Sequence, residues 1–274
     1  MRPEGVTIPV IRLHGTIAAG GSQLQPRLSL ASTAGLIEKA FAVKDAPAVA
    51  ISINSPGGSP VQSRLIHRRI RDLAKEKNKR VLVFVEDVAA SGGYMIAAAG
   101  DEIIADPSSI VGSIGVISAS FGFVDLLKKI GVERRVHTAG NNKSVLDPFR
   151  PERKEDVARL KELQLEIHQT FIDLVKERRG DRLKDDPELF TGLFWTGTGA
   201  IERGLVDALG DMRSALKSRY GEKTRLKLIG PQRGLFRRFS PFTVREAGAR
   251  LAAGAAEGGL DALAEREMWA RYGL

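Results

Sequence analysis

The sequence predicts an α/β protein built on a mainly parallel sheet. Short, β-branched apolar runs alternate with stretches of helical spacing between residues 6 and 130. Two glycine-rich turns, at 54–60 and 89–93, each directly follow one of these apolar runs. In a parallel sheet the turns that follow strands lie on one edge, where ligands bind. We therefore expect the functional residues along that edge.

Composition limits the classes of protein to consider. A chain of 274 residues, 43% of them apolar, can bury a sizeable core as one large domain or a domain with appendages. The absence of cysteine excludes a disulfide scaffold and a thiolate metal site. The net charge of +9 either serves general solubility or indicates a partner with an anionic surface, such as a membrane or a nucleic acid. Since no recognised nucleic-acid module is present, we expect no nucleic-acid partner.

The first part of the chain alternates strands and helices. Apolar runs at 6–13, 48–53 and 80–85 predict buried strands. Apolar residues at helical spacing predict helices over 29–43 and 61–77, and residues 18–26, rich in Gly, Ser and Gln, predict a loop.

The strand at 80–85 leads into the most informative stretch, which ends in Ala90, Ser91 and two glycines before a predicted helix at 94–99. A serine at a strand-to-helix corner points its hydroxyl out of the turn. The first helical N–H groups beside it are unpaired and carry the positive end of the helix dipole. That arrangement suits a nucleophile with an oxyanion donor attached, but a plain serine N-cap explains it equally well.

The earlier glycine turn runs Asn54-Ser55-Pro56-Gly57-Gly58. It matches neither the phosphate-binding pattern G-x-x-x-x-G-K-[ST] nor G-x-G-x-x-G. A backbone oxyanion donor fits it better, and a plain turn remains the alternative.

Further short elements follow. Residues 101–105 and 133–138 predict strands, 110–117 a turn and strand with Ser113 between glycines, and 121–130 a helix. The polar loop 139–149 carries Lys143. A lysine there is either a plain surface charge or, when partly desolvated, a general base.

The rest of the chain, from residue 151 on, is expected to support the fold and to contribute no catalytic residue. Residues 151–178 predict a long helix with an apolar stripe for core or subunit contact, 200–209 a short helix and 225–229 a last strand. We divide the chain into a domain at 1–230 and a basic, aromatic linker with a C-terminal helix at 231–274. Residues 231–250 hold five arginines and one glutamate, and an Ala-rich helix is expected over 244–269. Peripheral membrane contact, oligomer contact and an unordered tail all fit this composition.

Taken in order, several motifs resemble the signal peptide peptidase A family of serine peptidases. They are Asn54-Ser55-Pro56-Gly57-Gly58, Ala90-Ser91-Gly92-Gly93-Tyr94, Gly112-Ser113-Ile114-Gly115-Val116, Lys143, Trp195-Thr196-Gly197 and Gly204-Leu205-Val206-Asp207. Each motif is weak alone, whereas their common order from residue 6 to 211 is specific. The resemblance implies a fold of the crotonase and Clp protease type.

The resemblance also implies a mechanism. Ser91 matches the nucleophile, Lys143 the general base, Gly58 and Gly92 the backbone oxyanion donors, and Ser113 a hydroxyl that orients the lysine. It implies peptide substrates such as remnant signal peptides and a homo-oligomer. No His, Asp or Glu cluster has metal-ligand spacing, so we expect no metal, and we expect no cofactor. The family is often membrane-anchored, whereas this sequence has no apolar run of roughly 20 residues and no signal-peptide core. We therefore expect it in the cytoplasm or at the periphery of a membrane.

Three alternatives stay open. A Ser-His-Asp triad would have to use His14, His67, His137 or His168. His137 is the best candidate, yet it sits inside a predicted strand with no obvious carboxylate partner. A crotonase-like acyl-CoA enzyme would share the sheet and the oxyanion turn. A non-catalytic assembly scaffold would need no nucleophile.

Overall fold

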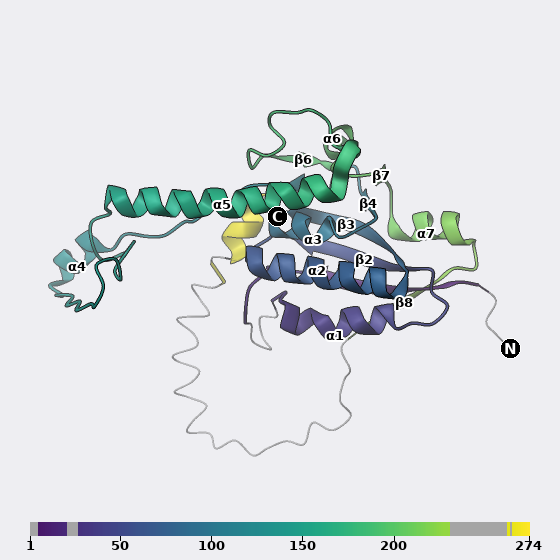
Figure 1. Cartoon of the computed structure of the whole chain (residues 1–274), viewed down its shortest axis with the longest axis horizontal. Coiled ribbons are helices and arrows are strands. Elements are labelled where there is room, and N and C mark those ends of the chain that lie inside the picture. The colour runs from purple at the N-terminus through teal and green to yellow at the C-terminus, as the bar shows by residue number, and fades with distance from the viewer. Residues whose placement is uncertain (1–4, 21–26, 231–261, 264) are drawn as a thin grey trace, which may run out of the picture.

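The computed structural model describes residues 5–20, 27–230, 262–263 and 265–274, and these form an α/β structure around one sheet (Figure 1). Within the described residues the sheet has eight strands in the order β6-β5-β3-β2-β1-β8, with β4 between β3 and β7. Among the strands that the structure describes, β5 and β6 form the only antiparallel pair. The predicted fold class, α/β with a mainly parallel sheet of the Clp-protease type, is confirmed.

The strands are β1 (Thr7–His14), β2 (Ala48–Ser55), β3 (Arg80–Ala90), β4 (Glu102–Ala105), β5 (Ile110–Gly112), β6 (Phe194–Thr196), β7 (Ala208–Leu209) and β8 (Arg225–Leu228). The helices are α1 (Leu30–Phe41), α2 (Pro60–Lys77), α3 (Gly92–Ala97), α4 (Val124–Ile130), α5 (Lys154–Arg179), α6 (Gly197–Glu202) and α7 (Met212–Tyr220), with a 3₁₀ turn at Gly180–Arg182. The predicted strands and helices before residue 110 are therefore confirmed, although β3 continues to Ala90, and most of the predicted loop at 18–26 lies outside the described residues. The strand predicted within 110–117 ends at Gly112, and the helix predicted at 200–209 ends at Glu202 and is followed by β7.

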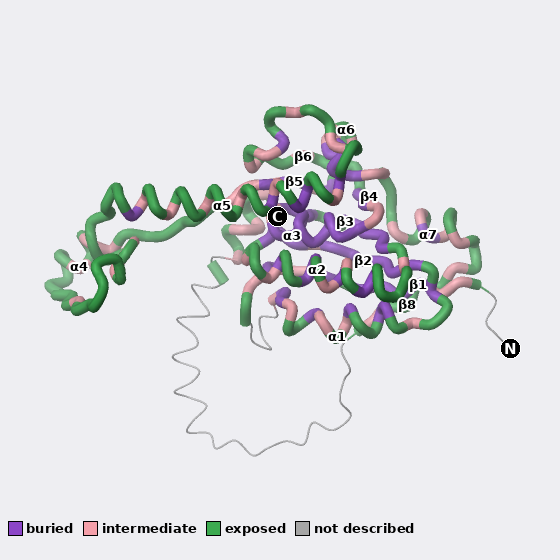
Figure 2. Tube along the Cα trace, viewed as in Figure 1, coloured by how far each residue is buried: buried purple, intermediate pink, exposed green. Residues whose placement is uncertain are grey.

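Helices cover both faces of the sheet. Ile51 and Val83 point from the sheet into a large buried cluster with Ile37, Ile66 and Phe171, so α1, α2 and the second half of α5 lie on that face. The other face carries a smaller buried cluster closed by Leu216 of α7. Figure 2 shows that burial is concentrated in and around the sheet.

The long strand β3 pairs with two different strands on the same side, one after the other along its length. Its first half pairs with β4, from Leu82 opposite Glu102, and its last residues pair with β5, from Val88 opposite Ile110. Because β3 extends beyond β4, the turn that follows Ala90 meets the turn that follows β5.

An arm projects from the sheet. Figures 1 and 2 show α4, the segment 131–153 and the first half of α5 standing away from the body and largely exposed. The predicted strand at 133–138 is wrong, since these residues form no strand. They lie in the arm, where no neighbouring strand supplies ladder hydrogen bonds, and Val136 is the one apolar residue among them.

The apolar stripe of α5 is buried only in part. Phe171, Leu174 and Val175 are core residues, whereas Leu163 and Ile167 remain 40% and 38% exposed. No helix within the described residues is both long and apolar enough to cross a membrane. The basic, aromatic stretch and most of the predicted helix at 244–269 lie outside the described residues, although 265–270 are helical.

Candidate active site

Ser91 stands at a sharp corner between β3 and α3. Its backbone has φ 51° and ψ −123°, a left-handed φ that a serine adopts only when the surrounding structure fixes it. Its backbone N–H donates to the carbonyl oxygen of Gly112 at 2.9 Å. Its side chain makes no capping hydrogen bond to α3. The N-cap alternative therefore does not account for this hydroxyl, which is left for another partner.

Ser113 is placed beside Ser91 by the sheet. Ala90 and Gly112 are partners in the parallel ladder of β3 and β5, so the two serines are the next residues along adjacent strands. Ser113 also has a positive φ, 52°, and its N–H donates to the carbonyl oxygen of Leu193 at 2.8 Å. Both hydroxyls are thus positioned by backbone hydrogen bonds.

The turn after β2 brings Gly57 and Gly58 to the same edge. The N–H of Ile17 donates to Gly57 O at 2.8 Å, and the N–H of Ser59 donates to Ile17 O at 2.7 Å. Since Gly58 lies between these two bonded residues, its own N–H points to the other side of the chain.

Neighbouring atoms come so close to Gly57 and Gly92 that neither position has room for a side chain. A Cβ on Gly57 would lie 2.8 Å from the Cβ of Ser91, and one on Gly92 would lie 2.3 Å from Ser63 Oγ and 3.4 Å from the Gly58 nitrogen. The amides of Gly58 and Gly92 therefore flank Ser91 at close range, and Gly92 is at the helix start, where N–H groups lack helical partners. Two such donors form the arrangement that stabilises an oxyanion.

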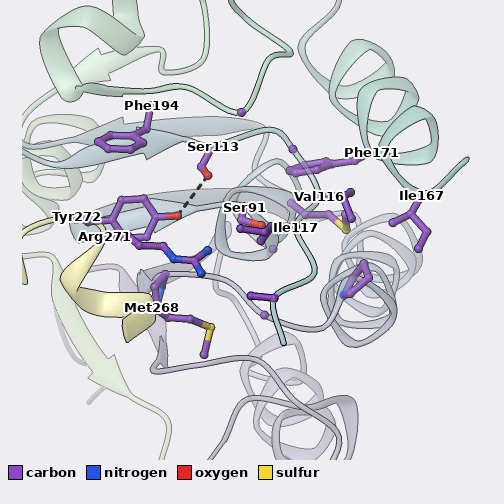
Figure 3. Close-up of a pocket in the computed structure, with 18 of the residues that line it drawn as sticks. Ser91, Ser113, Val116, Ile117, Ile167, Phe171, Phe194, Met268, Arg271 and Tyr272 are labelled. Carbon is purple, nitrogen blue, oxygen red and sulfur yellow. Dashed lines mark hydrogen bonds between the residues drawn. The ribbon is translucent and has the colours of Figure 1, made fainter. Parts of the chain in front are cut away.

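These residues open into a cavity of about 690 Å³ (Figure 3). Its lining contains Ser91, Ser113, Gly58 and Gly92 together with mostly apolar side chains, namely Met95, Val116, Ile117, Ile167, Phe171 and Phe194. The structure thus brings together four of the five predicted site residues.

Lys143 is the fifth and lies elsewhere. It is exposed in the arm, in the segment between α4 and α5 that Figure 1 shows at the far end from α3, and it does not line the cavity described above. Two carboxylates hold the backbone that follows it. Asp147 accepts hydrogen bonds from Ser144 Oγ at 3.2 Å and from Phe149 N at 3.0 Å, and Asp156 accepts one from Leu146 N at 3.2 Å. The loop of Lys143 is therefore ordered although it is exposed.

Histidine offers no base at this site. His14 Nε2 lies 2.7 Å from Ser52 Oγ, His168 Nε2 lies 3.0 Å from Ile114 O, His67 is buried and His137 is exposed in the arm. None of the four lines the cavity of Ser91, so the Ser-His-Asp alternative has no base in this chain. Within the described residues, no group of three or more His, Cys, Asp or Glu is arranged to hold a metal ion.

The cavity also contains residues that sequence reasoning missed. Glu267, Met268, Arg271 and Tyr272 line it, and the Tyr272 hydroxyl donates to Ser113 Oγ at 3.2 Å. Tyr272 is 159 positions from Ser113 in the sequence, and no motif surrounds it. No local pattern could have assigned it to this site.

Comparison with known proteins identifies the family. The model of peptidase family S49 matches residues 73–224, which is more than half of the chain. The chain belongs to peptidase family S49. The match spans Ser91, Ser113 and Lys143, and the resemblance to signal peptide peptidase A enzymes is thereby confirmed.

Individual relatives agree with this membership. A putative protease of Methanocaldococcus jannaschii is 37% identical over 66% of this chain and 57% of its own length. The chloroplastic serine protease SPPA of Arabidopsis thaliana is 34% identical over 76% of this chain and 31% of its own. A Brucella abortus protein named Na(+)/H(+) antiporter NhaA is 69% identical over 97% of this chain but only 37% of its own length. This S49 chain therefore spans little more than a third of that relative, whose name describes a much longer protein.

Proposed function

We propose that this S49 chain is a serine endopeptidase with Ser91 as its nucleophile. The observation that carries the proposal is the strained corner at Ser91, where an uncapped hydroxyl stands between the amides of Gly58 and Gly92 in an apolar cavity. Family membership and the protease names of several relatives support the same activity.

The proposed reaction proceeds by acyl transfer. Ser91 Oγ attacks the peptide carbonyl carbon, and its proton passes to a general base. The amides of Gly58 and Gly92 stabilise the negative charge that develops on the carbonyl oxygen. The base then protonates the leaving amine, and water repeats the sequence to release the acyl group from Ser91.

We assign the general base to Lys143 of a second copy of the chain. No lysine lines the described cavity of Ser91, whereas Lys143 stands in an ordered loop at the end of a projecting arm. An amine accepts a proton only when it is neutral, and cover by a neighbouring molecule would desolvate it and favour that form. Ser113 Oγ, beside Ser91, would then orient the incoming amine.

The exposed apolar surface of the arm supports such an assembly. Leu126, Ile130, Val132 and Leu165 of the arm are each at least half exposed in the single chain, as is Phe121 just before α4. An isolated soluble protein rarely leaves so many large apolar side chains on one projection. A homo-oligomer in which each arm reaches the cavity of its neighbour would bury them and complete the site.

The cavity favours apolar peptide segments. Apart from Glu267 and Arg271 of the C-terminal segment, its lining is mainly apolar, from residues such as Met95, Phe171 and Phe194, and offers little to a charged side chain. Remnant signal peptides, rich in apolar residues, are therefore the substrate class that we propose. The peripheral membrane contact suggested by residues 231–250 would bring the enzyme to such peptides, and it remains a prediction that lies outside the described residues.

A fluorophosphonate probe tests the nucleophile. We expect covalent labelling of Ser91 in the assembled protein, mapped by mass spectrometry, and its loss in Ser91→Ala. Ser109→Ala, which removes a buried serine outside the cavity, should label normally. The same Ser91→Ala change should lower hydrolysis of an apolar fluorogenic peptide by roughly a thousandfold or more. Absence of labelling, with turnover of an acyl-CoA thioester, would favour the crotonase-like alternative, and absence of any turnover would favour the scaffold.

A further inference from the structure

A segment from the other end of the chain lines one side of the proposed active site. Residues 265–270 are helical, and a turn follows at 271–273. Figure 3 shows Met268, Arg271 and Tyr272 on one side of the cavity and Phe171 and Ile167 on the other. Glu267 of the same segment also lines the cavity.

The segment contacts the described wall at separate points. The Tyr272 hydroxyl donates to Ser113 Oγ at 3.2 Å, and the Tyr272 ring meets Phe194 edge-on with centroids 5.1 Å apart. Near its other end, Glu265 Oε1 accepts a hydrogen bond from Thr16 Oγ1 at 3.4 Å. Thr16 precedes Ile17, which holds the turn of Gly57 and Gly58. The segment therefore touches both sides of the Ser91 corner.

The segment is folded as a helix and turn, not as an extended peptide. Its own backbone uses two of its carbonyl oxygens, since Tyr272 N donates to Trp269 O at 2.9 Å and Arg271 N donates to Glu267 O at 3.2 Å. A serine nucleophile attacks a carbonyl whose oxygen is free to enter the oxyanion site. The segment thus lines the cavity as a helix and turn in which the carbonyls of Glu267 and Trp269 already accept hydrogen bonds.

Occupancy by this segment conflicts with the proposed catalytic state. Tyr272 takes a hydrogen-bonding position on Ser113 Oγ, the hydroxyl assigned to orient Lys143 of the second copy. Arg271 adds a guanidinium to the cavity lining, which disfavours the approach of another cation.

We propose that residues 265–274 form a latch that docks in the cavity of its own chain, closes the site and must leave before a peptide and the partner lysine enter. The inhibitory part of this inference rests on the proposed function. The contacts are few and the segment is mainly half-exposed or exposed, so each contact is weak. Because the segment is tethered to the chain that it inhibits, weak contacts suffice to keep the cavity occupied, while binding of a substrate can displace them.

Crosslinking tests the docking without any need for activity. The chain has no cysteine, so the double variant Thr16→Cys with Glu265→Cys carries the only two thiols. A short thiol-to-thiol crosslinker should join them within one chain, and peptide mapping should recover the pair. Each single variant is the control, because it can crosslink only between copies. Absence of the pair, or its formation only between chains, would overturn docking of the latch in its own chain.

Labelling rates test the inhibition. Tyr272→Ala removes the hydroxyl and the ring, so we expect fluorophosphonate labelling of Ser91 and kcat/KM for a peptide to rise severalfold. Arg266→Ala is the matched control, because Arg266 is exposed on the same helical turn and does not line the cavity. Equal rates for the Tyr272→Ala variant and the wild type would refute an inhibitory role. No labelling in any variant would refute the proposed function together with the inhibition, while crosslinking would still decide whether the segment docks.

Discussion

The backbone N–H of Ser91 donates to the carbonyl oxygen of Gly112, which immediately precedes Ser113. This single hydrogen bond joins the corner after β3 to the corner after β5. Both serines have positive φ values, 51° and 52°, so each corner depends on the other to keep a costly backbone conformation. The spacing of the two hydroxyls is therefore a property of the sheet rather than of side-chain packing.

Gly57→Ala should disable the site. The new Cβ would lie 2.8 Å from the Ser91 Cβ and 2.9 Å from the Gly92 nitrogen, at a φ of +106° that alanine adopts only with strain. We expect peptidase activity to fall to background. Gly35→Ala is the matched control, since a Cβ at Gly35 meets nothing within 4 Å and Gly35 is in α1. It should stabilise the protein by up to about 1 kcal/mol in denaturant unfolding and keep full activity. An active Gly57→Ala enzyme would contradict the close packing described here.

The sequence predicted those parts of the site that depend on local chemistry. Ser59 and Pro60 begin α2 as N-cap and first helical residue, and the turn and helix there follow from neighbouring residues alone. The corner at Ser91 was likewise readable, because small residues lay between a strand and a helix. No neighbouring residue, however, shows whether the Ser91 hydroxyl caps the helix or is free. That depends on the direction in which the side chain points.

Contacts between residues far apart in the chain could not be predicted from the sequence. The segment 133–138 was expected to form a strand, but a strand exists only where another strand can pair with it. The position of Lys143 on a projecting arm and that of Tyr272 in the cavity depend on how distant segments pack. Neither leaves a periodic pattern in the sequence.

Asp207→Asn should destabilise the fold strongly. Arg179 is 2% exposed and donates to both carboxylate oxygens of Asp207 at 2.8 Å, and to the carbonyl oxygen of Gly204 at 2.8 Å. Removal of the negative charge leaves a buried guanidinium without its counterion, which costs about 3–5 kcal/mol. Denaturant unfolding should show this loss. Asp72→Asn, which affects an exposed pair with Arg68 at 3.8 Å, should cost less than about 1 kcal/mol. Equal effects of the two changes would contradict this assignment.

His67 should make the protein sensitive to acid. Burial, together with the cations Arg178 and Arg71, lowers the pKa of His67 from 6.5 to about 4. Between these values the unfolded chain binds a proton that the folded chain does not, so stability falls as the pH drops from about 6.5 towards 4. The loss is up to about 3 kcal/mol. Unfolding free energies at several pH values measure it.

The variant that isolates this effect is His67→Leu. Its unfolding free energy should depend less on pH between 4 and 6.5 than that of the wild type, whatever its absolute stability. His137→Gln, at an exposed histidine in the arm, should leave the pH dependence unchanged. A wild-type slope in His67→Leu would exclude His67 as its origin.

Lys143→Arg should be inactive while the protein remains folded and assembled. Arginine keeps the positive charge and hydrogen-bonding capacity but does not release a proton in proteins, so it cannot serve as a general base. By the same argument, wild-type kcat/KM should rise with pH as the lysine ammonium loses its proton. Lys128→Arg, at an exposed lysine of α4 in the same arm, is the control and should retain full activity. An active Lys143→Arg variant would assign the base to another group.

Mixing two inactive variants decides whether the site is shared between chains. Ser91→Ala retains Lys143, and Lys143→Ala retains Ser91, so a site completed by a neighbour becomes active only where the second variant receives an arm from the first. Random assembly of equal amounts gives that pairing at about a quarter of the contacts, and we expect about a quarter of the wild-type activity. Each variant mixed with itself is the control, and exchange between chains is followed with fluorescently tagged copies. Complete exchange without recovered activity would place both residues in one chain. A monomer by light scattering, at concentrations where the wild type is active, would exclude the shared site altogether.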